Sequence, residues 1–290
     1  MDDGIFRGYS AEELELQFNP RAAVPDHEEI VAAGVERAAE YRKAAANATY
    51  DVAYGGHAME TMDIFRPADS TGAPVHVYIH GGFWRSRVKE DFSYVAGPLV
   101  DAGAIVAVVN YALCPDVTLD EIVRQMRACC AFLHNNPDVH GGDPDRIHIS
   151  GHSAGGHLAA MLMATDWPAY DAGLPADLIK SAVMISGIYE IAPVMNISVQ
   201  EAVRLTPEIA ERNSPISMKP ATRAPIAITV GGAESDEFRR QSSALSDAWW
   251  NDASVEHFEL PGLNHFSVLS ETANADNPLT EARLRLMGLG

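Results

Sequence analysis

Residues 104–111, with the sequence AIVAVVNY, are apolar at nearly every position and rich in β-branched side chains. A strand with one face in water alternates apolar and polar residues, whereas a strand that is covered on both faces need not. Residues 75–80, VHVYIH, form a second β-branched run. Because parallel sheets carry helices on both faces, the two runs predict strands of a mostly parallel sheet.

Strand-like and helix-like segments alternate along much of the chain. A capping box at Thr118–Glu121 opens a segment whose apolar residues recur at helical spacing, and residues 91–103 are also expected to be helical. The alternation predicts an α/β fold with helices on both faces of the sheet. Further strands are expected at residues 146–150, 181–189, 224–232 and 254–262, further helices at 156–165, 237–251 and the C-terminus, and two antiparallel strands at 50–56 and 59–67.

Two segments do not follow this alternation. Residues 10–46 look helical, with capping boxes at Ser10–Glu13 and Asp26–Glu29 and a proline-containing break between them. Residues 191–220 place a helix-like piece between loops. We expect a single domain, residues 1–290, in which elements from residues 1–46 and 191–220 form a small helical cap over a functional site. The alternative for residues 191–220 is an excursion that touches no substrate.

The charge balance of the chain disfavours some partners. There are 21 Lys and Arg against 40 Asp and Glu, for a net charge of −19, so nucleic acid and anionic membrane surfaces are poor partners. The opening MDDGIFRGYS lacks the basic and apolar regions of a secretory signal, and no apolar run is long enough to span a bilayer. Three cysteines, two of them adjacent, suit a reducing compartment. We therefore expect a cytoplasmic protein.

Residues 151–157, GHSAGGH, join a predicted strand to a predicted helix. Gly-x-Ser-x-Gly is the spacing of a nucleophile elbow, with Ser153 between Gly151 and Gly155. A serine on such a turn has a strained backbone, and the glycines avoid collisions with the neighbouring strand and helix. The helix that follows offers free N–H groups to an anion beside the serine. We expect Ser153 to be a nucleophile; the alternative is a tight turn with a serine cap.

A serine nucleophile needs a base and an orienting acid, which in this arrangement follow it in the order serine, acid, base. His265 comes just after the last predicted strand and is the expected base. His257 lies inside that strand, where a packing or surface role is expected. The loop after the preceding strand carries Glu234, which we expect to be the acid, and Asp236, which is the alternative.

The sequence HGGFW, residues 80–84, follows another predicted strand. Acyl transfer builds negative charge on a carbonyl oxygen, so backbone N–H groups must already point to that oxygen. Glycines let the loop approach closely. The expected donors of this oxyanion hole are the amides of Gly81, Gly82, Phe83 and Ala154. The expected substrate-binding side chains are those of Phe83, Trp84 and His152.

Eleven histidines raise the question of a metal site. His148, His152 and His157 are close to Ser153 in sequence, but strand alternation and the tight turn argue against their convergence on one ion. No H-E-x-x-H or paired-cysteine spacing occurs. We expect no metal and no other cofactor, and a structural role for His80 in ordering its loop.

Together, HGGFW, GHSAGGH and the segment ESDEFRRQS at residues 234–242 resemble the α/β-hydrolase fold and, within it, the hormone-sensitive-lipase-like esterases. They are more similar to the serine-type kynurenine formamidases (arylformamidases), whose opening segment resembles residues 9–27. The resemblance spans about Tyr9 to His265. It implies a triad without a metal and favours Glu234 over Asp236 as the acid. The triad residues that it implies are Ser153, Glu234 and His265.

The resemblance also implies a reaction. It indicates a serine hydrolase that cleaves a small amide or ester through an acyl-enzyme, with an N-formyl aryl amide such as N-formylkynurenine as the first candidate substrate. The alternative is a short-chain carboxylesterase, and a more remote one is an inactive hydrolase-fold binding protein. The expected partner is a small-molecule substrate, and the family suggests a homodimer.

Overall fold

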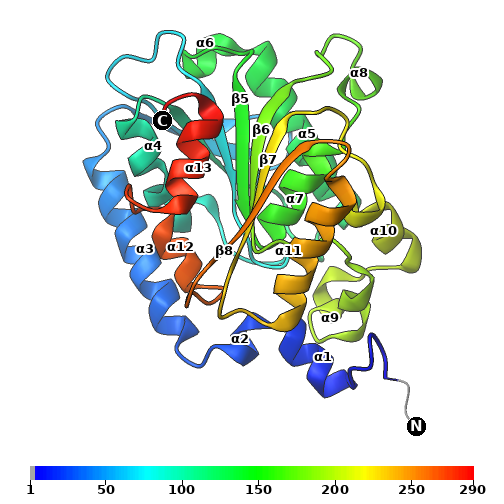
Figure 1. Cartoon of the computed structure of the whole chain (residues 1–290). Helices are drawn as coiled ribbons and strands as arrows, with labels where there is room; N and C mark the ends of the chain where they lie inside the picture. Colours follow the sequence, from blue (N-terminus) through cyan, green and yellow to red (C-terminus); the bar gives the residue numbers. More distant parts are fainter. Residues whose placement is uncertain (1–3) are drawn as a thin grey trace.

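The computed structural model describes residues 4–290, in which eight strands form one sheet (Figure 1). Their order across the sheet is β1-β2-β4-β3-β5-β6-β7-β8. The β1/β2 and β2/β4 pairs are antiparallel, and every later pair is parallel. This mostly parallel sheet confirms the prediction. The strands are β1 (Ala48–Ala53), β2 (Thr61–Phe65), β3 (Val75–Ile79), β4 (Ile105–Val109), β5 (Ile147–His152), β6 (Ile179–Ile185), β7 (Pro225–Gly231) and β8 (Ser254–Leu260).

Strand β4 is buried on both faces, which explains why its sequence is apolar throughout. Ile105, Ala107 and Val109 point into a core shared with the helices of one face, whereas Val106 and Val108 point into a second core on the other face. All five residues are fully buried. Burying one such aliphatic side chain stabilises the fold by about 1.5–3 kcal/mol, so both faces of the strand contribute.

Helices cover both faces of the sheet, as Figure 1 shows. One face carries α5 (Leu119–Asn135), α7 (Ala154–Met163) and α11 (Asp236–Trp249). The other carries the 3₁₀ helix η1 (Lys89–Ala96), α4 (Gly97–Asp101), α12 (Ser267–Glu271) and α13 (Pro278–Met287), with α3 (His27–Ala44) packed over η1. Short helices α6 (Pro137–His140) and α8 (Trp167–Tyr170) lie in connections.

The single helix predicted at residues 91–103 is wrong in detail. The chain forms η1 and then α4, which has Pro98 in its first turn. Proline has no N–H to donate, so one α-helical ladder cannot run through this point. Gly97 lies at the junction, where an added Cβ would come within 3.3 Å of the Tyr41 ring on α3.

The predicted capping boxes have different outcomes. Ser10 and Glu13 make both bonds of the box at the start of α1 (Ala11–Phe18). Thr118 accepts from the Glu121 amide, but the Glu121 carboxylate binds neighbouring side chains instead of closing the box. Asp26 makes no side-chain cap bond, because its backbone (φ −93°, ψ 14°) is not extended as an N-cap requires.

The N-terminal helices and residues 191–220 meet at the lower end of the sheet in Figure 1. Helix α1 contacts both α11 and the 3₁₀ helix η2 (Ala192–Asn196), and Glu15 accepts two hydrogen bonds from Ser198. The remaining helices here are α2 (Pro20–Ala23), α9 (Gln200–Val203), α10 (Pro207–Arg212) and η3 (Pro215–Ser217). Residues 191–220 thus form several short turns rather than one helix.

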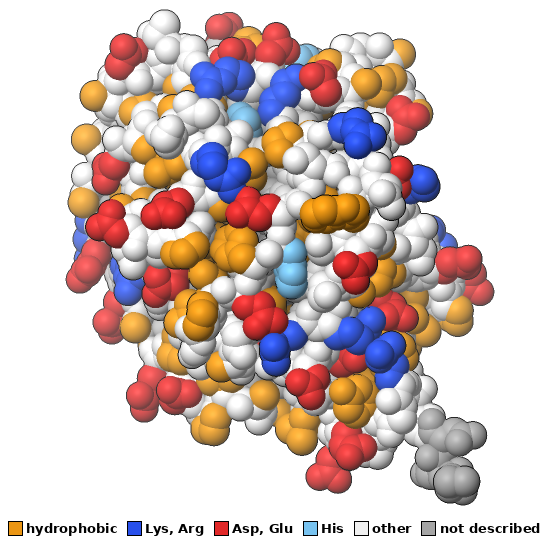
Figure 2. Space-filling model, viewed as in Figure 1, with side chains coloured by type: hydrophobic (Ala, Val, Ile, Leu, Met, Phe, Trp, Pro, Cys, Tyr) orange, Lys and Arg blue, Asp and Glu red, His pale blue; other side chains and the backbone are white. Residues whose placement is uncertain are grey.

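The surface is mixed in charge. On the face that Figure 2 shows, acidic side chains are spread among basic and apolar ones rather than gathered in one patch. None of the helices within residues 4–290 is both long enough and apolar enough to cross a bilayer.

Candidate active site

Ser153 lies at the sharp joint between β5 and α7, with φ 56° and ψ −118°. Few residues other than glycine adopt this backbone conformation, so the surrounding structure must enforce it. A Cβ on Gly151 would collide with the backbone of Gly155, and one on Gly155 would collide with the Ile79 carbonyl of β3. The two glycines therefore permit the contact of strand and helix that forces Ser153 outward at the joint.

His265 and Glu234 come from the loops that follow β8 and β7. The Nδ1 atom of His265 lies 2.6 Å from Oε2 of Glu234, whose side chain is fully buried. Oε1 of the same carboxylate accepts from the Ser186 hydroxyl at 2.5 Å and from the Gly231 amide at 2.8 Å. The carboxylate is thus held at both oxygens, and it fixes the orientation of the imidazole.

The structure brings Glu234, not Asp236, to the histidine. Asp236 is the first residue of α11 and is exposed to solvent. The Ser235 hydroxyl accepts from the Phe238 amide, and helix α11 therefore begins directly after Glu234. The predicted packing or surface role of His257 fits its place within β8.

Aromatic rings surround the imidazole of His265. The Phe238 ring lies 4.4 Å from it and the His152 ring 4.6 Å from it, between centroids. Burial, together with the neighbouring His265, lowers the pKa of His152 well below its ordinary value. His152 is therefore a neutral, buried neighbour at neutral pH.

The loop at residues 80–84 approaches Ser153 closely. A Cβ on Gly81 would lie 3.0 Å from the Ser153 Cβ and 2.8 Å from the His152 carbonyl. Gly82 and Phe83 have φ of 120° and 50°, and their amides have no acceptor in the described part of the chain. The Ala154 amide opens α7, where the first N–H groups of a helix have no intrahelical acceptor.

Trp84 does not line the cavity, contrary to the prediction. Phe83 and Trp84 both have positive φ, and the Trp84 side chain is fully buried behind the loop. Its Nε1–H donates to Nδ1 of His157 at 3.2 Å, and Nε2 of His157 donates to the Asn213 carbonyl at 2.8 Å. Trp84 thus ties the loop to α7 and to residues 191–220.

His80 is buried in the same loop. Its ring is stacked between Phe92 and Tyr111, and its Nδ1 lies 2.7 Å from the Gly81 carbonyl. The Tyr111 hydroxyl donates to the His80 carbonyl at 2.8 Å. Burial lowers the pKa of His80 to about 4, so the ring is neutral and supports the loop.

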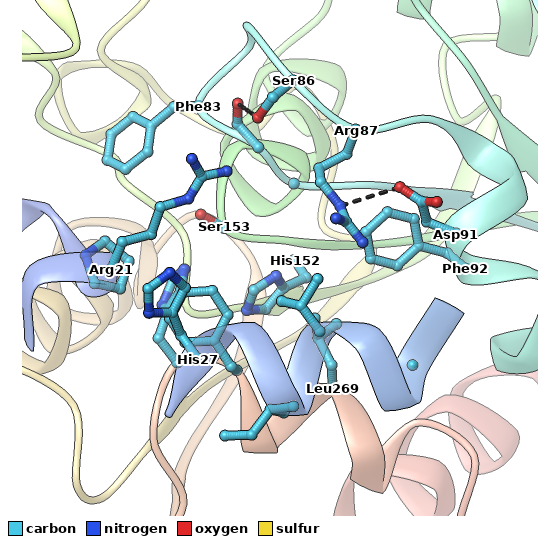
Figure 3. A pocket seen from close by; sticks show the side chains of 18 of the residues that line it. Arg21, His27, Phe83, Ser86, Arg87, Asp91, Phe92, His152, Ser153 and Leu269 are labelled. Atoms are coloured by element: carbon cyan, nitrogen blue, oxygen red, sulfur yellow. Dashed lines mark hydrogen bonds and ion pairs between the residues drawn. The ribbon is translucent and has the colours of Figure 1, made fainter. Parts of the chain in front are cut away.

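Ser153, His265 and Gly81–Phe83 line a cavity of about 360 Å³ (Figure 3). His152 also lines it. The facing wall comes largely from α2, α3 and the residues beside them, between Asn19 and Arg37, while residues 191–220 contribute Val199. Both predicted cap segments therefore reach the cavity, but the N-terminal one supplies most of the wall.

Several residues around this cavity are not marked by the sequence. His27 packs its ring against Phe266 at 5.4 Å, and Arg21 reaches into the cavity from α2 (Figure 3). Neither carries a local signal, since each meets the site only through the fold. Ser186 has φ 51° directly after β6, and a serine followed by glycine at a strand end was the signal available for it.

The histidines near Ser153 in sequence were expected not to converge on one metal ion. His148 bonds Ser181 on β6, and His157 bonds Trp84 and Asn213, whereas the His152 ring lies against His265. Within residues 4–290, no group of three or more His, Cys, Asp or Glu side chains is placed to hold a metal ion.

The chain is similar to several known proteins. The family model BD-FAE matches residues 62–248. The chain is 33% identical to kynurenine formamidase of Danio rerio, over 98% of each chain. It is 30% identical to the esterase LipQ of Mycobacterium tuberculosis, over 78% of this chain and 59% of that one.

Among solved structures, the fold is similar to that of a protein described as a thioesterase from Silicibacter sp. TM1040. The TM-score is 0.81 at 26% identity, over 93% of this chain and 98% of that one. The predicted α/β-hydrolase fold is confirmed, and the enzyme class of the relatives is that of hydrolases. The chain belongs to the BD-FAE family of α/β-hydrolases and, within it, to the kynurenine formamidase family.

Proposed function

We propose that this protein is a serine hydrolase whose preferred substrates are N-formyl aryl amides such as N-formylkynurenine. One observation carries the proposal: Ser153, His265 and the Gly81–Phe83 loop line the same cavity, and Glu234 binds the far nitrogen of the histidine. In the proposed mechanism, the Ser153 hydroxyl attacks the formyl carbon while His265 accepts the proton. The Glu234 carboxylate stabilises the imidazolium that forms.

The proposed oxyanion hole acts on the tetrahedral intermediate. The amides of Gly82, Phe83 and Ala154 donate to the developing oxyanion, and Gly81 keeps the loop close to the serine. His265 then protonates the leaving amine, which departs and leaves a formyl-Ser153 ester. Water, deprotonated by His265, hydrolyses this ester and releases formate.

The choice of a formamide is supported by the relatives and by the cavity wall. A relative that matches 98% of this chain, with 98% of its own length covered, bears the name kynurenine formamidase. The rings of Phe83, Phe92 and Phe266 and the side chain of Leu269 line the cavity and provide an apolar surface for an aryl leaving group.

Turnover of three substrates tests the proposal. N-formylkynurenine, formanilide and p-nitrophenyl acetate would be compared as kcat/KM with purified protein, using Ser153→Ala to measure background. We expect N-formylkynurenine to exceed the other two by at least about tenfold, a difference of roughly 1.4 kcal/mol in transition-state binding. Equal, weak rates on all three would contradict the formamidase assignment.

A short-chain carboxylesterase is the second candidate. The similarity to the esterase LipQ favours it. A marked preference for p-nitrophenyl acetate over both formamides in the same assay would support this candidate instead. No turnover of any of the three would point to the inactive binding protein.

We also propose a cytoplasmic location. Cys114, Cys129 and Cys130 are free and buried, and burial raises the pKa of the Cys114 thiol to about 11 and that of Cys130 to about 12. Unreactive free thiols are compatible with a reducing compartment. The single domain and the homodimer stay predictions.

A further inference from the structure

The charge of the cavity differs from that of the whole chain. The chain has a net charge of −19, yet four arginines and only two acidic residues line the cavity. An acidic protein repels anions at long range, so a local excess of arginine at the active site calls for a local ligand. The four arginines are Arg21, Arg37, Arg85 and Arg87, and the acidic residues are Glu28 and Asp91.

Two of these arginines already have partners. Arg87 lies 3.1 Å from Asp91, and its guanidinium lies over the Phe92 ring (Figure 3). Arg37 lies over the Tyr94 ring and donates to the Ser270 carbonyl. Their positive charges are therefore engaged within the wall.

Arg21 and Arg85 differ from them. Within residues 4–290, neither side chain makes an ion pair or a hydrogen bond. The charge of Arg85 helps to lower the pKa of Glu15, after the hydrogen bonds from Ser198 and Asn19, but the Glu15 carboxylate is bound to those two residues. Among the residues that the structure describes, no carboxylate is paired with either guanidinium.

The two arginines line the same cavity, and the charge of Arg85 acts on Arg21. Burial, and then the charges of Arg85 and Arg87, lower the pKa of Arg21. Figure 3 shows Arg21 extending from the N-terminal helices across the cavity toward the loop that carries Phe83 and Ser86. Arg85 follows Trp84 on that same loop. Two like charges brought together without a counter-ion cost free energy that a bound anion would recover.

We propose that Arg21 and Arg85 form an anion subsite at the mouth of the cavity, and that this subsite binds a carboxylate on the leaving-group side of the substrate. The inference rests on the proposed function for the identity of the reaction. Guanidinium groups bind carboxylates through paired N–H donors, which sets orientation as well as affinity. The substrate class is therefore N-formyl aryl amides that carry a carboxylate, such as the α-carboxylate of an amino acid, rather than neutral formamides.

The decisive experiment compares an acid with its neutral analogue. The kcat/KM for N-formylkynurenine would be divided by that for its carboxamide, in the native protein and in Arg21→Gln, Arg85→Gln and the double variant. Because the groups are exposed, we expect this ratio to fall by about fivefold in each single variant and by roughly twentyfold in the double variant. The change should come chiefly from KM for the acid.

A matched control removes the same charge elsewhere. Arg223 is exposed on the loop before β7 and does not line the cavity. Arg223→Gln should leave the ratio unchanged, which separates a local subsite from a change in net charge. Circular dichroism would establish that each variant is folded.

A binding measurement separates this proposal from the proposed function. Kynurenine and its carboxamide would be titrated calorimetrically into the native protein and the double variant, with no turnover required. Tighter binding of the acid that is lost in the double variant supports the subsite, even if formamides are not hydrolysed. An acid-to-carboxamide ratio that the double variant does not alter, in both turnover and binding, overturns the subsite, even if N-formylkynurenine is hydrolysed.

Discussion

The cavity has two sides that are built in different ways. We call the corner at Ser153, the loop 80–84 and the Glu234–His265 pair the catalytic floor, and residues 19–37 the outer wall. The floor is buried, and its side chains are held by buried hydrogen bonds. Four of its residues have positive φ, as does Ser186, which supports Glu234. The wall is largely exposed or half-buried and reaches the floor through side chains such as His27.

This difference separates two tasks. A reaction mechanism needs atoms fixed within a fraction of an ångström, which close backbone contacts and buried bonds provide. Substrate choice can be changed by exposed side chains without disturbing those bonds. We therefore expect changes to the floor to lower kcat and changes to the wall to alter KM.

The largest expected effect is that of removing the nucleophile. Ser153→Ala should lower kcat by about 10⁴- to 10⁶-fold, because a triad acts as a unit. The matched control is Ser242→Ala on α11, whose buried hydroxyl has no partner. Steady-state kinetics on N-formylkynurenine measures both. If Ser153→Ala retained most of the activity, the catalytic floor would not be the site of the reaction.

The next effect distinguishes the two candidate acids. Glu234→Gln should lower kcat by about 10³- to 10⁴-fold, because an amide neither fixes the imidazole tautomer nor stabilises the imidazolium. Asp236→Asn should have little effect, since Asp236 is exposed at the start of α11. The same kinetic assay tests the pair, and the reverse ranking would show that the loop is arranged differently.

Acid should destabilise the floor. His80 and His157 are fully buried, and burial lowers the pKa of each to about 4. Between the ordinary histidine pKa of about 6.5 and pH 4, the unfolded chain binds protons that the native protein does not, so the free energy of unfolding falls as pH falls. At pH 5 we expect a loss on the order of 2 kcal/mol for each histidine.

Urea unfolding at pH 7.5, 6 and 5 measures this loss. His157→Gln should flatten the pH dependence, although it lowers stability at pH 7.5. The control is His57→Gln, which changes an exposed histidine far from the cavity lining. An unchanged slope in His157→Gln would contradict the assignment of acid sensitivity to this histidine.

A smaller effect is expected when the loop loses its attachment. Trp84→Phe removes the N–H that donates to His157 and leaves a buried acceptor unpaired. We expect kcat to fall by about tenfold, with a loss of stability of about 1–3 kcal/mol. Trp250→Phe is the control, because Trp250 is 64% exposed. An unchanged kcat would mean that the loop holds its shape without this bond.

The smallest expected effect lies in the wall. His27→Ala removes the ring that packs on Phe266, next to His265. We expect KM to rise by about threefold with kcat nearly unchanged, the scale of a single aromatic pair. If His27→Ala lowered kcat as much as Trp84→Phe does, the outer wall would affect the chemical step as well as substrate binding, contrary to our expectation.

Local patterns predicted much of the fold and of the floor. Each of these features lies within a few residues of the sequence pattern that predicts it. They are the burial of both faces of β4, the strand–turn–helix at Ser153, and the loops that carry His265 and Glu234. Their relative order in the chain was sufficient to bring them to one edge of a parallel sheet. The roles of these residues stay predictions until they are tested.

What sequence alone could not predict depends on dihedral angles and distant contacts. Trp84 looks like a pocket residue beside Phe83, but successive positive φ values turn it into the core. Arg21 and His27 have no local pattern that marks a site, because the residues that they face follow much later in the chain. The wall is therefore the part of the site that needed a structure.

The docking of α1 also bears on the order in which the protein can assemble. Helix α1 is synthesised first, yet it docks on η2, α11 and Ser198, which leave the ribosome much later. Until those segments emerge, α1 lacks the surface on which it docks, and contacts of such long sequence separation form slowly. The cavity around the serine, which His265 and Phe266 also line, can therefore be completed only once nearly the whole chain has emerged.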